Sequence, residues 1–224
     1  MISRLIASGI YSTLGNVRVL HGERSAMPGP YVLASNHISH FDPPLLSVAT
    51  RRKIDWMAMK DLFKHPLASL YLNTIETFPV DRDNLDRASV RTALQRLKKG
   101  HIVGMFPEGG IRAGSTSVLE GAPMRPGAGA LAHMADVPLL PCVILGTDRL
   151  YKRANWRIFG SVPFWVGFGE PIRPASGMDK AEARAYLERE LATAFKNLLA
   201  ELRAHFQLSD ADIPKTPGER RVEA

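Results

Sequence analysis

The sequence predicts a single α/β domain with a central mixed, largely parallel sheet flanked by helices, and three observations support this fold class. Short apolar runs alternate along the chain with segments of helical periodicity, which is typical of strands connected by helices. The 224 residues are enough for one large domain and short for two. Hydrophobic residues make up 45% of the chain and charged residues 23%, so a packed core is expected.

The strands and helices can be justified in order along the chain. Residues 17–22 (VRVLHG) and 30–35 (PYVLAS) are short apolar runs, which predict buried strands. A helix should follow at 43–50, because Asp42 is placed to cap it and proline is tolerated in a first helical turn. Further strands are expected at 53–59, 76–80, 101–107, 138–145 and within 161–172. Further helical segments are expected at 61–75, 84–99, 126–136 and 178–207.

Three regions divide the chain. Residues 1–16 should form an amphipathic helix whose apolar face suits either a membrane interface or the domain itself. The residues on that face are Ile2, Leu5, Ile6, Ile10 and Leu14. Residues 17–207 are expected to form the domain, and the polar segment 208–224 is expected to be a flexible tail. The N-terminal segment is too short and too weakly apolar to predict a signal peptide.

The charge composition narrows the class of partner. Lys and Arg number 29 and Asp and Glu number 22, so the net charge of +7 suits an acidic partner such as nucleic acid, an anionic bilayer or a phosphorylated metabolite. Aromatic and basic residues are not interleaved as in single-strand binders, and no zinc-finger or basic-zipper pattern occurs, so we expect no nucleic-acid partner. Cys142 is the only cysteine, which excludes an intrachain disulfide. No run approaches the roughly 18 apolar residues of a spanning helix.

The segment NHISHFD, residues 36–42, follows an apolar run and carries two histidines and a carboxylate. His37 and Asp42 would differ in direction by about 140° on an ideal helix, and on a strand they would face opposite sides. Only a turn brings these two side chains together. An imidazole whose Nδ1–H is held by a carboxylate presents Nε2 as a base in the correct tautomer. We therefore predict that His37 is a general base and that Asp42 orients it.

Two other interpretations of this turn stay open from the sequence. Asp42 would serve only as the N-cap of the next helix, and His37 would be an ordinary loop residue. Alternatively, His37, His40 and Asp42 would bind a metal ion. No further cluster of His or Asp at tight spacing accompanies them, so we expect no metal site.

Polar residues also follow two other predicted strands. FPVDR places Arg82 just past a strand end, and FPEGG places Glu108 at another. Gly109 and Gly110 free the backbone there for close approach to a ligand, and Arg112 follows. Because ligands gather at the carboxyl ends of strands in α/β sheets, we expect the active site at this edge.

Together with VPLLP, residues 137–141, these segments form four blocks in a fixed order along the chain. With these blocks the sequence resembles the glycerolipid acyltransferases, typified by the 1-acylglycerol-3-phosphate (lysophosphatidic acid) acyltransferases. Asn36, His37 and Asp42 match the first block of that family, in which Asn-His is followed by four residues and Asp. FPVDR is similar to the second block, which ends in an acidic residue and arginine. FPEG matches the third block residue for residue, and VPLLP matches the fourth. The resemblance covers roughly residues 17–175.

The resemblance implies direct acyl transfer from a thioester to the free hydroxyl of a lysophospholipid. His37 would remove the hydroxyl proton, and Asp42 would orient His37. Arg82 would hold the acceptor phosphate, since a guanidinium fork matches phosphate oxygens. The other expected substrate-binding residues are Glu108, Gly109, Lys60 and Arg112. The family usually continues Glu-Gly with threonine and arginine, whereas two residues separate Gly109 from Arg112 here.

We therefore expect a 1-acylglycerol-3-phosphate O-acyltransferase that forms phosphatidic acid in phospholipid biosynthesis. Its expected partners are a lysophospholipid acceptor, an acyl-CoA or acyl carrier protein thioester as co-substrate, and an anionic membrane surface. No metal and no cofactor are expected. We expect a peripheral, monotopic protein on the cytoplasmic side of the cell membrane. Another lysolipid acceptor, a thioester or ester hydrolase on the same scaffold, and a basic binding module without catalysis remain as alternatives.

Overall fold

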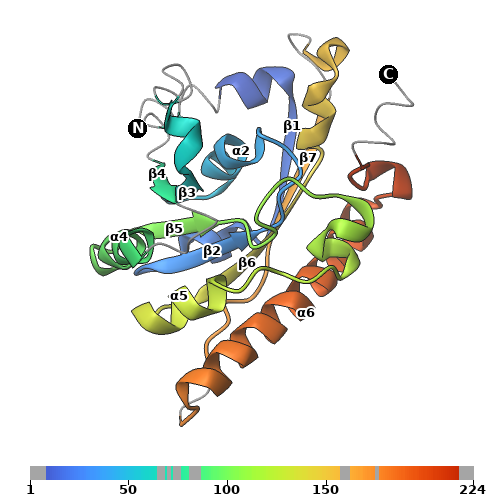
Figure 1. Ribbon diagram of the computed structural model, residues 1–224. Helices are drawn as coiled ribbons and strands as arrows, with labels where there is room; N and C mark the ends of the chain where they lie inside the picture. The colour runs from blue at the N-terminus through green and yellow to red at the C-terminus, as the bar shows by residue number, and fades with distance from the viewer. Residues whose placement is uncertain are drawn as a thin grey trace.

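The protein forms one seven-stranded sheet flanked by helices (Figure 1). The computed structural model describes residues 9–64, 69, 72, 77–80, 87–156, 162–174 and 177–216. Within these ranges the strand order is β1-β7-β6-β2-β5-β3-β4. The predicted α/β domain with a mixed, largely parallel sheet is confirmed.

Five neighbouring strands of the sheet run in the same direction. They are β2 (Tyr31–Ser35), β3 (Ile54–Met59), β4 (Phe78–Val80), β5 (Ile102–Met105) and β6 (Leu139–Leu145). β7 (Val162–Phe168) pairs antiparallel with β6, and β1 (Gly15–Leu20) pairs parallel with β7. The carboxyl ends of the five parallel strands therefore meet at one edge of the sheet, which is where a ligand is expected in this fold class.

Helices cover both faces of the sheet (Figure 1). On one face lie α2 (Asp42–Ala49) and a helical segment at residues 9–14. On the other face lie α4 (Arg87–Lys98), α5 (Ala128–Ala135) and α6 (Lys180–Phe206). The 3₁₀ helices are η1 (Gly22–Ala26), η2 (Lys60–Lys64), η3 (Gly114–Thr116), η4 (Val118–Glu120), η5 (Thr147–Tyr151), η6 (Arg153–Asn155) and η7 (Asp210–Asp212).

The central strands are apolar on both faces because each face is covered by helices. In β2, Val32 and Ala34 pack toward α5 and α6, whereas Tyr31 and Leu33 pack toward α2. This division follows from the alternation of side chains along a strand. All four side chains are fully buried. β2 therefore forms a rigid base for the turn that follows it.

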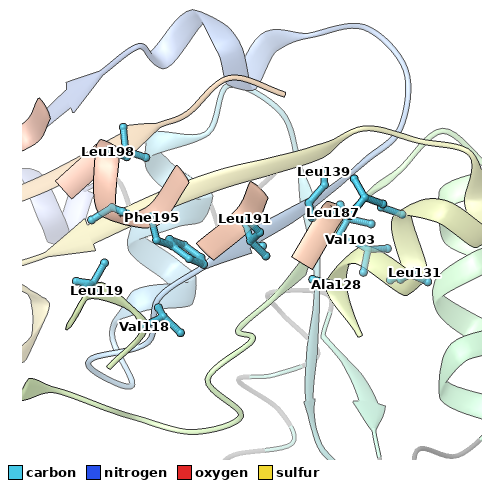
Figure 2. Packing of buried hydrophobic residues seen from close by; sticks show 14 of the residues in the cluster. Val103, Val118, Leu119, Ala128, Leu131, Leu139, Leu187, Leu191, Phe195 and Leu198 are labelled. Atoms are coloured by element: carbon cyan, nitrogen blue, oxygen red, sulfur yellow. The ribbon is translucent and has the colours of Figure 1, made fainter. Parts of the chain in front are cut away.

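α6 closes the second face with one apolar stripe. Leu187, Leu191 and Phe195 repeat at four-residue spacing and are fully buried, so they fall on the same side of the helix. Figure 2 shows these side chains against residues of the sheet and of α5. The helix begins with a capping box in which Asp179 accepts from backbone N–H groups and Glu182 bonds back to the Asp179 N–H. The predicted long closing helix is thus present.

The N-terminal boundary differs from the prediction. β1 begins at Gly15, two residues before the predicted strand. Glycine is required at this position, because a Cβ would lie 2.0 Å from the Val162 carbonyl oxygen of β7. The helical segment 9–14 buries Tyr11 and Leu14, whereas Ile10 is 48% exposed. Ile10 and Leu14 therefore do not share one buried face. Residues 1–8 lie outside the described ranges, so the rest of the expected amphipathic helix is untested.

Residues 208–216, the first part of the expected flexible tail, make contacts with the domain. Leu208 is buried against the core, and η7 is held by a capping box between Ser209 and Asp212. The Asp212 carboxylate also accepts a hydrogen bond of 2.8 Å from the Arg149 guanidinium. These contacts return the chain to the domain after α6, in spite of its polar composition. Residues 217–224 lie outside the described ranges.

Cys142 lies in β6 and is fully buried, and this burial raises the pKa of its thiol. Among the helices that the structure describes, none combines the length and the apolar character needed to cross a bilayer.

Candidate active site

The turn after β2, residues 36–42, lies at the shared carboxyl edge of the five parallel strands. Its first residue, Asn36, is fully buried and continues the sheet with its side chain. The Asn36 amide nitrogen donates to the Ile144 carbonyl at 2.9 Å, and its amide oxygen accepts from the Ile144 N–H at 2.8 Å. The side-chain amide thus replaces a backbone peptide in the ladder to β6. The start of the turn is fixed by this pair.

His37 and Asp42 meet across the turn, as the sequence predicts. His37 Nδ1 lies 2.7 Å from Asp42 Oδ2. Because a carboxylate oxygen accepts, Nδ1 carries the hydrogen, and Nε2 of the neutral ring is left as the proton acceptor. The His37 side chain is 12% exposed and that of Asp42 is fully buried. This is the arrangement of an oriented general base.

Asp42 is not the N-cap of α2 that the sequence suggests. Phe41 occupies the N-cap position, and Asp42 is the first residue of the helix. Its carboxylate turns back over the preceding turn, where Oδ2 accepts from the Ile38 N–H at 2.7 Å and from the Ser39 N–H at 2.9 Å. Oδ1 accepts from the Thr147 hydroxyl, which comes from η5 after β6. A capping role alone is therefore wrong, and four donors from two segments hold this carboxylate.

Glu108, from the FPEGG block after β5, holds the backbone of His37. Its Oε2 accepts from the His37 N–H at 2.5 Å. Its Oε1 accepts from the Ser117 hydroxyl at 2.7 Å and from the Val118 N–H at 2.9 Å. The residue is only 5% exposed, and this burial raises the pKa of its carboxyl group. The geometry gives Glu108 a positioning role, and its expected contact with substrate stays a prediction.

The imidazole of His37 is also supported by aromatic stacking. The centre of the His37 ring lies 4.0 Å from the centre of the Phe106 ring, and the angle between the two ring planes is 16°. Phe106 in turn stacks on Trp56 at 5.1 Å and 6°. Gly104 leaves room for the indole, since a Cβ at that position would lie 2.7 Å from two of its ring atoms. The ring plane of His37 is therefore set by β3 and β5 as well as by Asp42.

The glycine after Glu108 has a conformational reason. Gly109 has φ +67°, a left-handed conformation that glycine adopts without strain. A Cβ on Gly109 would also lie 2.4 Å from Cδ of Arg125. The loop then returns to the catalytic turn, where the Arg112 N–H donates to the His37 carbonyl at 2.8 Å. The group next to Gly109 in the structure is the Arg125 side chain, and the expected close approach to a ligand stays a prediction.

The expected phosphate-binding residues follow different strands at the same edge. Lys60 is exposed at the start of η2, directly after β3. Arg112 is exposed, and its guanidinium lies near Gly110. β3 is the second strand from β2 in the sheet, so Lys60 is displaced from the turn by about 10 Å of sheet width. Arg82 lies outside the described residues, so its predicted contact is untested.

The second histidine of the turn has its own partner. His40 is exposed, and its Nδ1 lies 2.6 Å from the Tyr151 hydroxyl. The same hydroxyl accepts from the His40 backbone N–H at 3.2 Å. Partial burial lowers the pKa of His40, and the neighbouring His37 lowers it further. Within the described ranges, no group of three or more His, Cys, Asp or Glu side chains is arranged to hold a metal ion.

Sequence reasoning missed Thr147, Phe106, Ser117 and Tyr151 as parts of this site. Thr147 and Tyr151 follow β6 closely, and proximity to a strand end was the available signal for them. Phe106 was included in the FPEGG block but had no assigned role. For Ser117 no local signal exists, because it reaches Glu108 through a loop. Thr147, Phe106 and Ser117 support Asp42, the His37 ring and Glu108 respectively, whereas Tyr151 bonds His40.

The arrangement supports proton abstraction from a substrate hydroxyl or water. His37 has a defined tautomer, a fixed ring plane and a fixed backbone, so its Nε2 points in one direction. General-base catalysis requires this preorganisation. Among the described residues, no Ser hydroxyl or Cys thiol is hydrogen-bonded to the His37 ring, whose partner is Asp42.

Comparison with known proteins agrees with this geometry. A family model described as Acyltransferase matches residues 16–145. The 1-acyl-sn-glycerol-3-phosphate acyltransferase of Bacillus subtilis is 32% identical over 170 residues, covering 74% of this chain and 78% of that protein. The protein of the same name from Streptococcus pneumoniae is 28% identical over 122 residues, which cover 54% of this chain and 43% of the Streptococcus protein.

One solved structure shares the fold. The crystal structure of the 1-acyl-sn-glycerophosphate (LPA) acyltransferase from Thermotoga maritima superposes with a TM-score of 0.62 over 88% of this chain and 77% of that chain. Its sequence is 21% identical, so this likeness supports the architecture alone. The family match spans the turn of His37, the FPEGG block and β6.

Proposed function

The chain belongs to the acyltransferase family, and from this premise we propose that it moves a fatty acyl group from an acyl thioester to the free hydroxyl of 1-acylglycerol 3-phosphate, forming phosphatidic acid. The observation that carries the proposal is the His37–Asp42 pair, 2.7 Å apart at the carboxyl edge of the sheet. A carboxylate-oriented imidazole suits an acceptor that brings its own hydroxyl. The relative from Bacillus subtilis, which bears the name of this activity, supports the same acceptor.

In the proposed mechanism, His37 acts on the acceptor hydroxyl. Nε2 takes the hydroxyl proton while the oxygen attacks the thioester carbonyl carbon. Throughout the reaction the Asp42 carboxylate accepts a hydrogen bond from the His37 Nδ1–H, and it stabilises the imidazolium that forms. The carbon–sulfur bond then breaks, and the leaving thiolate receives the proton from His37. An ester and a free thiol result, and the enzyme returns to its starting state.

The phosphate of the acceptor requires cations at the same edge. We assign this role to Arg82, with Lys60 and Arg112 as further contacts, because in the sequence all three follow strands whose carboxyl ends lie at this edge. Arginine suits this task since its guanidinium binds two phosphate oxygens at once. Arg82→Ala is therefore expected to raise the KM for the phosphorylated acceptor more than it lowers kcat. An unchanged KM would remove Arg82 from this role.

The remaining partners follow from the same chemistry. The donor is proposed to be acyl-CoA or acyl-acyl carrier protein, used as a co-substrate. The acceptor is a membrane lipid, so we propose a peripheral location on an anionic membrane surface at the cytoplasmic side. The net charge of +7 supports attraction to such a surface.

The central test is His37→Ala, assayed with acyl-CoA or acyl-acyl carrier protein and lysophosphatidic acid, with the lipid product identified by mass spectrometry. General-base catalysis is worth about 10²–10⁴-fold, so kcat should fall by at least about a hundredfold. His101→Ala is the matched control, since His101 is bonded to Asp55 near the amino ends of the strands and should leave kcat within about twofold. A loss of only a few-fold in His37→Ala would remove His37 as the base.

The same assay separates the other activities. Release of free fatty acid that does not depend on added lysophosphatidic acid would identify a hydrolase. A higher kcat/KM for a lysophospholipid with a head group would identify a different acceptor on the same framework. Transfer that requires lysophosphatidic acid and yields phosphatidic acid supports the proposal.

A further inference from the structure

Two large aromatic side chains and two cations are exposed together on η5 and the segment after it. Tyr151 is 43% exposed and Trp156 is 51% exposed. Lys152 and Arg153, which lie between them in the sequence, are exposed as well. We refer to these four residues as the aromatic-basic patch. Most aromatic side chains of a single domain are buried, so an exposed pair beside cations indicates a surface for a partner.

The aromatic-basic patch is joined to the catalytic turn. The Phe41 ring lies 5.8 Å from the Tyr151 ring and 5.7 Å from the Trp156 ring. The Tyr151 hydroxyl bonds His40, three residues from His37. These contacts place the patch at the rim of the site rather than on a remote face.

The helical segment 9–14 borders the same turn. The Tyr11 hydroxyl donates to the Phe41 carbonyl at 2.6 Å, so this helix and the patch both contact Phe41. Ile10, next to Tyr11, is 48% exposed. In Figure 1 the helix at 9–14 and the golden η5–η6 segment lie together at the upper end of the molecule. Exposed apolar surface therefore surrounds the catalytic turn on two sides.

The chemistry of the patch is that of a membrane interface. Tyr and Trp have an apolar ring and a polar group, and they concentrate where a bilayer meets water. Here both polar groups are satisfied within the protein, because the Trp156 Nε1–H donates to the Leu150 carbonyl at 2.6 Å and Tyr151 bonds His40. The rings can therefore enter the lipid interface without losing hydrogen bonds. The two cations between the rings, Lys152 and Arg153, are exposed and complement anionic head groups, whereas Arg149 of the same segment is paired with Asp212.

We propose that the aromatic-basic patch is the surface by which this protein docks on an anionic lipid bilayer. The inference rests on the proposed function, since an enzyme that takes a lysophospholipid must receive it from a membrane. Docking through residues 151–156 places Phe41 and the turn of His37 next to the lipid surface. The acceptor then reaches His37 from the bilayer without crossing bulk water.

An acidic protein would also be attracted by Lys152 and Arg153, but the two exposed rings favour lipid. A carrier protein that docks by charge has no need for exposed Trp and Tyr with satisfied polar groups. The basic helix α4 is the contrasting surface, because its exposed Arg91 and Lys98 have no exposed aromatic side chain among their helical neighbours. Helix α4 therefore provides a control for the effect of charge alone.

The first experiment uses intrinsic fluorescence. The chain has three tryptophans, of which Trp56 and Trp165 are 1% and 3% exposed, so a change of solvent contact reports on Trp156. Phosphatidylglycerol-containing vesicles should shift the emission of the full chain to shorter wavelength, and brominated lipids should quench it. Both effects should vanish in Trp156→Phe, which keeps a ring against Phe41. Absence of a shift, or a shift that survives in Trp156→Phe, would overturn the proposal.

The second experiment measures flotation with phosphatidylcholine vesicles, with and without phosphatidylglycerol. The double variant Lys152→Glu/Arg153→Glu should lose binding to the anionic vesicles by about tenfold or more, since each cation near such a surface contributes severalfold. The matched control Arg91→Glu/Lys98→Glu changes the net charge equally and should keep most of the binding. Equal losses in both variants would assign binding to overall charge, and no loss in the first variant would exclude the patch. Thermal unfolding of both variants confirms that they are folded.

Membrane docking by the patch and acyl transfer by the enzyme can be tested separately. A dispersed short-chain acceptor in the absence of vesicles should be acylated by the Lys152→Glu/Arg153→Glu variant at the rate of the natural chain, whereas acceptor embedded in anionic vesicles should be acylated more slowly. Vesicle binding that depends on the patch, without acyl transfer to any acceptor, would contradict the proposed function but support the docking surface. Transfer from vesicles at the same rate in both proteins would contradict the docking surface but support the proposed function.

Discussion

His37 is held by contacts that reach it from three different strands. Its Nδ1 bonds Asp42 within the turn after β2, and its ring stacks on Phe106 after β5. Its backbone N–H bonds Glu108, and Asp42 is in turn held by Thr147 after β6. A base that is fixed in this way loses little freedom when the substrate hydroxyl arrives, and such positioning lowers the barrier to reaction.

The support of Asp42 by Thr147 leads to the first prediction. Thr147→Val removes the donor to Oδ1 at nearly constant volume, so Asp42 is held less firmly and His37 is oriented less well. Loss of one hydrogen bond to a charged group costs about 1.5–3 kcal/mol, so kcat should fall by about tenfold to a hundredfold with little change in KM. Thr147→Ser keeps the hydroxyl and should restore most of the rate. A Thr147→Val enzyme with unchanged kcat would show that this bond serves stability alone.

His40 makes stability depend on pH. Its pKa in the folded protein is below the ordinary value of 6.5, mainly because of partial burial, so the unfolded chain binds the proton more tightly. The stability that the neutral ring contributes is therefore complete above about pH 6.5 and declines as the pH falls toward the lowered pKa. His40→Gln should show a smaller loss of unfolding free energy between pH 7.5 and pH 5.5 in urea titrations. Parallel curves for the two proteins would contradict this assignment.

At the level of elements, the amino and carboxyl ends of the strands have different tasks. The turn of His37 and the FPEGG loop follow the carboxyl ends of strands, whereas a partly buried ionic cluster lies at the amino ends. There Asp55 of β3 is 1% exposed, and its Oδ2 accepts from Arg96 at 2.7 Å and from His101 at 2.8 Å. The Arg96 guanidinium also lies 4.7 Å from the centre of the Phe78 ring. This cluster fastens α4 to the sheet.

Removal of Asp55 should therefore separate stability from catalysis. Asp55→Ala leaves Arg96 and His101 without their acceptor in a partly buried place, and the free energy of unfolding should fall by about 1–3 kcal/mol. Acyl transfer at a temperature where the protein stays folded should remain within about twofold, because the cluster lies away from the carboxyl ends. Arg91→Ala, an exposed change on the same helix, should alter stability by less than about 0.5 kcal/mol. A large loss of kcat in Asp55→Ala without loss of stability would contradict this division.

For the molecule as a whole, the sequence allowed the class and order of the elements and the local part of the site to be predicted. Apolar runs marked the strands, and the spacing of His37 and Asp42 required a turn that the structure contains. The support from Thr147 and Ser117 could not be predicted, because it depends on which strands and loops become neighbours. The sequence predicted that Asp42 turns to His37 but left a capping role open, since a helix start and a turn accept the same residue.

The tail shows the same limit for packing. Its polar composition indicated disorder, whereas in the structure Leu208 is buried and Arg149 pairs with Asp212. Neither contact can be recognised from the sequence, because each depends on which segments become neighbours. The sequence thus describes segments well and their mutual contacts poorly.

His37 and Asp42 are close in the sequence, whereas the residues that support them are distant. This difference affects the order in which the site forms during folding. His37 and Asp42 are five residues apart, whereas Glu108 reaches His37 across 71 positions and Thr147 reaches Asp42 across 105. Short loops close much faster than long ones, so the dyad can form early while its supports arrive only when β5 and β6 have docked. In a refolding experiment, recovered turnover should lag behind helical circular dichroism, which makes turnover a measure of the last strands to join.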